Sequence, residues 1–160
     1  HEVWTCFDTV KKKAPMPFHF SMQKVLDYRE QLEEEAKVRL AKAEQQRNEL
    51  RSRLEIIRKD LLEQEERLYT HPPNNAGERW LLEHFVKGLK ADMAATAVQL
   101  RAAENMVEES RRILAQRAMD RKILDKLKER QKQHYMHDER MKEQRFNDEI
   151  ATLRYKAPTF

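Results

Sequence analysis

The chain has 160 residues, of which 38% are charged, and it contains only 2 glycines and 5 prolines. So few helix breakers predict a small number of long elements. The net charge is +4, from 32 basic and 28 acidic residues. Because the two signs alternate along the chain, this composition argues against a strong polyanion binder. The single cysteine, Cys6, excludes an intrachain disulfide framework and fits a reducing cytoplasm.

No apolar run approaches the roughly 18 residues that a membrane span requires, and no signal peptide is visible. Residues 1–15 mix Trp4, Cys6 and Phe7 with a lysine run and show no sustained period. We expect them to form a flexible leader outside the fold. A short arm that touches a membrane or a nucleic acid is a minor alternative.

The first long helix is expected to begin at Ser21, whose hydroxyl can cap the free amides of the first turn. Phe20 and Val25 have the spacing of a hydrophobic staple around that cap. The helix should continue to about Tyr69. Residues at alternating steps of three and four give it a narrow coiled-coil seam. These are Met22, Leu26, Arg29, Glu33, Ala36, Leu40, Ala43, Arg47, Leu50, Leu54, Ile57, Leu61, Gln64 and Leu68.

Residues 70–77 hold two prolines, two asparagines and a glycine, and they predict the one internal turn. Asn75 and Glu78 have the spacing of a capping box for a second helix over about 78–154. A short loop between two long helices implies an antiparallel hairpin. The expected fold class is therefore all-α, an antiparallel two-helix coiled-coil hairpin with the second helix longer than the first.

The second helix continues the same seam. Its positions are Leu89, Met93, Thr96, Leu100, Ala103, Val107, Ser110 and Leu114. If Leu68 lies near Trp80, then Ser21 lies near Leu127, give or take one turn. The residues beyond Leu127 would then have no intrachain partner. They form either a docking element for another protein or a frayed, solvated tail.

No catalytic, cofactor or metal site is predicted. There is no glycine-rich phosphate loop, so the chain should not hydrolyse nucleotide. His134 and His137 beside Asp138 could supply two metal ligands, but a solvated helix face is the favoured interpretation.

Apolar residues crowd the turn and the helix that follows it. Trp80 either caps the open end of the coil or belongs to a contact surface. Leu81, Leu82, Phe85, Val86 and Leu89 cover more than one face of the helix. A two-helix hairpin buries only one face of each helix, so some of these side chains should be exposed and available to a partner.

At residue level the chain resembles the flagellar export protein family FliJ. The similarity rests on the opening Met16-Pro-Phe-His-Phe-Ser-Met-Gln-Lys-Val-Leu-Asp-Tyr-Arg, the polar break, and Arg79-Trp80 followed by Phe85 and Leu89. It covers roughly Met16 to Leu153. The resemblance implies a non-enzymatic, stalk-like coiled coil that binds the ring of the flagellar type III export ATPase. It also implies links to the export gate and to export chaperones, in the cytoplasm at the inner membrane beneath the flagellum.

The family's gate-contacting strip corresponds to Phe85 and Leu89, with Trp80 beside it. Two further family positions fall near Asp92 and Thr96, where this sequence departs from the pattern. The end away from the turn is expected to enter the ATPase ring, with Met22, Leu26, Tyr135 and Met141 as its contacts.

Three other functions stay open from the residues alone. One is a stalk protein of a virulence-type secretion system, and another is a generic coiled-coil scaffold. A third is a basic nucleic-acid-binding helix carrying Arg121, Lys122, Lys126, Lys128, Arg130 and Lys132. Acidic residues interrupt this last set, and a nucleic-acid binder would show a steep salt dependence.

Overall fold

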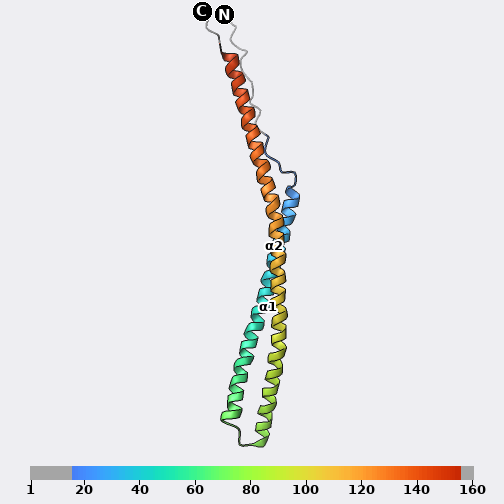
Figure 1. Ribbon diagram of the computed structural model, residues 1–160, viewed down its shortest axis with the longest axis vertical. Helices are drawn as coiled ribbons and strands as arrows, with labels where there is room; N and C mark the ends of the chain where they lie inside the picture. The colour runs from blue at the N-terminus through green and yellow to red at the C-terminus, as the bar shows by residue number, and fades with distance from the viewer. Residues whose placement is uncertain (1–15, 156–160) are drawn as a thin grey trace, which may run out of the picture. The chain divides into compact units, whose positions relative to one another are not determined.

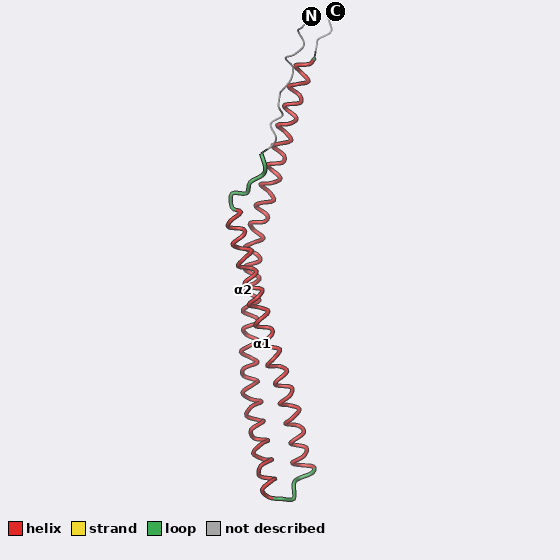
Figure 2. The backbone as a smooth tube through the Cα atoms, turned by 180° about the vertical axis from the view of Figure 1, so that it is seen from behind, coloured by secondary structure: helices red, strands yellow, loops and turns green. Residues whose placement is uncertain are grey.

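The computed structural model describes residues 16–155, and over this range it contains two helices and no strand (Figures 1 and 2). Helix α1 spans Gln23–Thr70 with 48 residues, and helix α2 spans Ala76–Arg154 with 79 residues. The all-α prediction with a longer second helix is therefore confirmed. The predicted helix ends differ by no more than two residues. The predicted leader 1–15 lies outside the described residues.

The packing divides the chain into two units. One contains residues 27–122, and the described part of the other comprises residues 16–26 and 123–155. In the first unit the two helices lie side by side and run antiparallel (Figure 1). Three interhelical ion pairs on the surface follow the register of this pair. Lys90 bonds Glu65 at 3.0 Å, Arg51 bonds Glu104 at 3.0 Å, and Arg111 bonds Glu44 at 3.4 Å.

The predicted seam is the buried face of both helices. On α1, Ala36, Ala43, Leu54, Ile57, Leu61 and Leu68 are all buried. On α2, Leu89, Thr96, Val107 and Ser110 are buried, and Val107 is only 1% exposed. The one predicted seam position that is exposed is Met22, at 36%. The narrow stripe, rather than a broad globular face, therefore holds the helices together.

The turn lies where the sequence predicts it, between Thr70 and Ala76. Helix α1 ends at Thr70, directly before the pair Pro72 and Pro73, which lack the amide hydrogens that a helix needs. Asn75 caps α2: its side-chain Oδ1 accepts a hydrogen bond from the Gly77 amide at 2.8 Å.

Near the turn, the core is a cluster of six buried residues shared by the two helices. Its members are Ile57, Leu61, Leu68, Leu82, Val86 and Leu89, with Met93 packed against them. Leu68 therefore faces Leu82 and Val86, slightly further along α2 than the predicted partner Trp80.

Within residues 27–122, a polar layer replaces the apolar seam at the end of the helix pair that is away from the turn. Glu33 is 8% exposed, and its carboxylate accepts a hydrogen bond from Arg121 Nε. One turn earlier, Arg29 donates to the Asp120 carbonyl at 2.6 Å. The Arg121 hydrogen bond holds the pKa of Glu33 below its usual range, so the carboxylate stays charged inside the seam.

In the second unit, the segment before α1 packs on α2. Phe20, Leu26 and Leu124 form a buried cluster, with Phe18 and Leu127 against it. The predicted staple between Phe20 and Val25 is wrong. Phe20 is buried in this cluster, whereas Val25 is 41% exposed.

The predicted start of the unpaired end of α2 also needs correction. The ring of Tyr135 lies 5.8 Å from that of Phe18, centroid to centroid, and its hydroxyl donates to the Met16 carbonyl. A shallow depression lined by Phe18 and His19 extends these contacts to Asp138. Contacts with α2 thus continue beyond Leu127, because residues 16–20, which precede α1 in the chain, lie along α2. Within the described residues, the part of α2 that follows these contacts is 139–154.

Candidate partner-binding surface

The first four turns of α2 carry two parallel stripes that differ by one residue in register. Leu82, Val86 and Leu89 form the buried stripe against α1. One residue earlier in each case, Leu81, Phe85 and Gly88 form a second stripe, with Asp92 one turn further on. Residues three and four apart on a helix are neighbours, so this second stripe is a continuous face.

The second stripe is exposed. Leu81 is 61% exposed and Phe85 is 52% exposed, although both are large apolar side chains. Gly88, which follows Phe85 by three residues, has only open space where a Cβ would lie. We call Leu81, Phe85, Gly88 and Asp92 the outer stripe. Adjacent exposed apolar side chains of this kind usually mark a contact surface.

Trp80 precedes Leu81 in sequence and lies on another side of α2, because successive helical residues are about 100° apart. It is 56% exposed and lies outside the buried cluster near the turn, so it does not cap the open end of the coil. Its ring lies 4.0 Å from that of His84, centroid to centroid. His84 Nδ1 is also 3.1 Å from the Trp80 carbonyl oxygen. This stacking presents a large aromatic surface with little freedom to move.

The three residues predicted to contact the export gate therefore differ in their exposure to solvent. Phe85 and Trp80 are exposed, whereas Leu89 is 9% exposed and belongs to the core. Leu89 occupies the seam position between Val86 and Met93, and α1 covers it. A partner can reach Phe85 and Trp80 without disturbing the helix pair, but it cannot reach Leu89 in this way.

The four residues predicted to contact the ATPase ring also differ in their exposure to solvent. Met22 is 36% exposed and Met141 is 39% exposed. Leu26 is 2% exposed and packs with Leu124, and Tyr135 is half-buried against Phe18. Leu26 and Tyr135 thus hold the amino-terminal segment on α2, and of these four residues the two methionines are the ones classed as exposed.

The polar side chains of the described residues do not gather into a metal site. No cluster of three or more His, Cys, Asp or Glu side chains suited to a metal ion occurs within residues 16–155. His134 pairs with Asp138 at 3.0 Å on an open helix face. Over the same residues, neither helix has a segment long and apolar enough to cross a membrane.

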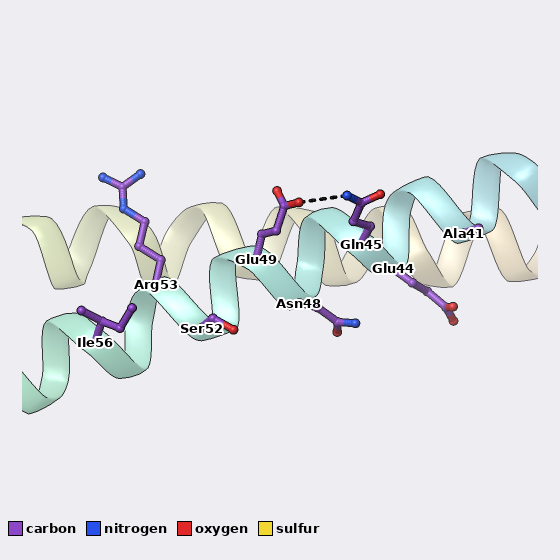
Figure 3. Close-up of a pocket in the computed structure, with 8 residues that line it drawn as sticks. All are labelled: Ala41, Glu44, Gln45, Asn48, Glu49, Ser52, Arg53 and Ile56. Carbon is purple, nitrogen blue, oxygen red and sulfur yellow. Dashed lines mark hydrogen bonds between the residues drawn. The ribbon is translucent and has the colours of Figure 1, made fainter.

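The surface depressions are shallow. One lies on α1 alone, between Ala41 and Ile56 (Figure 3). There Glu49 and Arg53 project to one side of the helix and Asn48 to the other, and Gln45 donates to Glu49 at 3.1 Å. A hollow formed by one helix cannot enclose a small ligand.

Sequence reasoning found the apolar excess after the turn but did not identify its exposed members. Leu81 was named in that set without being assigned to the exposed side, and Gly88 was not named as part of this surface, although a signal was available. Once Leu82, Val86 and Leu89 are assigned to the seam, the preceding residue in each case must face away from α1.

Comparison with known proteins gives a family for the chain. No match is found among curated proteins, and none among solved structures. The family described as "Flagellar FliJ protein" matches residues 18–159, nearly the whole chain. This chain therefore belongs to the flagellar FliJ family.

Proposed function

Membership in the flagellar FliJ family gives this chain a role in flagellar protein export, and we propose that it acts there as a stalk-like connector. In this proposal the coiled coil binds the export ATPase ring through the end away from the turn. The outer stripe and Trp80 bind the cytoplasmic part of the export gate. Contacts with export chaperones and association with the inner membrane at the flagellar base belong to the same proposal.

The observation that carries the proposal is the set of large apolar side chains left exposed on the first turns of α2, with Leu81 and Phe85 on one side of the helix. Trp80 and Phe85 are more than half exposed, and Leu81 lies between them in sequence and is also exposed. Large aromatic side chains dominate the energetics of protein interfaces when they enter a partner's pocket. An isolated two-helix coil gains nothing from leaving them in water.

The gate contact is tested by Phe85→Ala in a binding assay with the purified cytoplasmic domain of the export gate. Loss of an aromatic anchor costs about 2 kcal/mol or more, which corresponds to roughly a thirtyfold weaker Kd. The matched control is Val98→Ala, because Val98 is on the same helix and is 72% exposed. Helicity should be unchanged in both variants.

Swimming in soft agar provides the cellular readout. The Phe85→Ala variant should spread poorly, and the Val98→Ala variant should spread normally. Normal gate binding and normal swimming of Phe85→Ala would refute the gate contact. Leu89→Ala is unsuitable for this purpose, because Leu89 is buried and its loss would weaken the helix pair itself.

The ATPase contact is tested separately with Met22→Ala combined with Met141→Ala. Both side chains are partly exposed, so their loss should leave the melting temperature nearly unchanged. Met119→Ala is the control, because Met119 is also an exposed methionine, at 60%. Co-purification with the export ATPase should fall only in the double variant. Equal recovery of the ATPase by all three proteins would refute this part of the proposal.

The family match favours the flagellar system over a virulence-type system or a generic scaffold. The family is a structural component of the export apparatus rather than an enzyme. The basic residues between Arg121 and Lys132 are interrupted by Asp125 and Glu129, which does not favour nucleic-acid binding.

A further inference from the structure

Gly88 is the one glycine inside the body of either helix, and the fold does not explain it. Its backbone is helical, with no left-handed torsion that would require glycine. A Cβ added at this position would meet no atom within 4 Å. Neither backbone conformation nor packing inside the chain therefore excludes a side chain here. A glycine in the middle of a helix is also less stable than an alanine.

The position of Gly88 in the outer stripe gives a reason for it. Phe85 lies one turn before Gly88, and Leu81 lies two turns before it, both exposed. The stripe thus presents two large apolar side chains and then a site with no side chain. A surface that accepts Phe85 in a pocket can come down onto the helix backbone at Gly88, where a side chain would hold it away.

Asp92 adds a charge to this pattern, one turn beyond Gly88. It is exposed, and within the described part of the chain it has no ion-pair partner. The nearby Lys90 is instead engaged with Glu65 at 3.0 Å, and this contact raises the pKa of Lys90. A partner that covers the outer stripe would match it with an apolar socket for Phe85 and a basic group facing Asp92.

We infer that Gly88 is the point of closest approach between α2 and the export gate, and that the absence of a side chain there sets which surface can bind. This inference rests on the proposed function, because it takes the gate's cytoplasmic domain as the occupant of the outer stripe. It adds a steric requirement that the exposed aromatic residues alone do not impose. Gly88 acts by leaving space for the partner's backbone or a protruding side chain.

The test measures the affinity of the full chain for the purified gate cytoplasmic domain by calorimetry. Gly88→Leu should weaken the Kd at least tenfold, and Gly88→Ala should weaken it by a smaller factor. Both substitutions should raise the melting temperature of the free chain by roughly 1–4 °C, because each removes a helix-interior glycine without a clash. A gain in stability together with a loss of affinity is not expected from a merely structural position.

Ala97→Leu is the matched control. Ala97 is exposed on the same helix and lies nine residues after Gly88, which places it on the opposite side of α2. It should bind the gate domain like the unmodified chain. Circular dichroism should show the same helicity for all variants, which excludes unfolding as the cause of lost binding.

Phe85→Ala, measured in the same assay, distinguishes a failure of the inference about Gly88 from a failure of the proposed gate contact. If Phe85→Ala abolishes binding and Gly88→Leu binds within twofold of the unmodified chain, the inference about Gly88 is overturned and the gate contact stands. If neither variant changes the affinity, or if the unmodified chain does not bind the gate domain, both fail. If both variants lose affinity and Ala97→Leu keeps it, the inference is supported.

Discussion

The polar layer around Glu33 gives the most quantitative prediction. Replacing Glu33 with Gln keeps the size of the side chain and an oxygen that can accept from Arg121, but it removes the negative charge. The Glu33 side chain is 10% exposed and that of Arg121 is 26% exposed. Arg121 would then keep its charge in a partly buried place and lose the Glu33 carboxylate as one of its partners.

The loss in the free energy of unfolding caused by Glu33→Gln should lie between two limits. Exposed ion pairs contribute about 0–1 kcal/mol, whereas breaking a fully buried pair costs about 3–5 kcal/mol. Because Arg121 keeps some access to water and Gln retains the hydrogen bond, we expect Glu33→Gln to lower the free energy of unfolding by about 1–2 kcal/mol. For a chain of this size, that corresponds to a fall in melting temperature of roughly 3–6 °C.

The pH dependence has a definite sign. The hydrogen bond from Arg121 lowers the pKa of Glu33 in the folded state, with Lys37, whose Nζ is 3.7 Å away, adding to the effect. The stability that Glu33 contributes is therefore fully present above the unfolded carboxyl pKa of about 4.3. It is lost as the pH falls through the lower pKa of the folded state. The difference between the unmodified chain and Glu33→Gln should be constant from about pH 7 to pH 5 and shrink below about pH 4.

The assay is urea unfolding followed by circular dichroism at 222 nm, at several pH values. Glu34→Gln is the control, because Glu34 is adjacent, pairs with the same Lys37 and has a side chain that is 68% exposed. Its effect should stay within about 0.5 kcal/mol. Two results would refute the reasoning: equal stability of Glu33→Gln and the unmodified chain at pH 7, or a difference that persists unchanged at low pH.

Three further changes test other parts of the fold. Leu61→Ala should cost about 2–3 kcal/mol in urea unfolding, because Leu61 is 7% exposed in the cluster near the turn, whereas Leu62→Ala, at 68% exposure, should change stability by less than about 0.5 kcal/mol. Equal effects at these neighbours would contradict the assigned seam. Asn75→Ala should cost about 1 kcal/mol in the same assay through loss of the cap on α2, and a melting curve identical to that of the unmodified chain would count against this cap. Tyr135→Phe should leave the melting temperature nearly unchanged but speed amide hydrogen exchange over residues 16–22, because the bond to the Met16 carbonyl is lost while the ring contact with Phe18 remains; unchanged exchange would show that this bond does not hold the segment.

Much of the fold follows from the sequence. The alternating spacing of residues such as Leu54, Leu61 and Val107 identifies the buried face of each helix, because a helix can bury only the side chains that recur on one side. The proline pair and Asn75 locate the turn for equally local reasons.

The tertiary structure decided two features that the spacing of apolar residues could not: the packing of residues 16–20 and which apolar side chains stay exposed. The pairing of residues 16–20 with α2 depends on side-chain packing outside any helical repeat, so the contact of Phe18 with Tyr135 was missed. The exposures of Leu89 and Phe85 also differ because of packing between the helices. Both are apolar and one turn apart, but the position of α1 covers Leu89 and leaves Phe85 in water. Composition reports that apolar residues are in excess, and only the partner helix determines which of them remain free to bind.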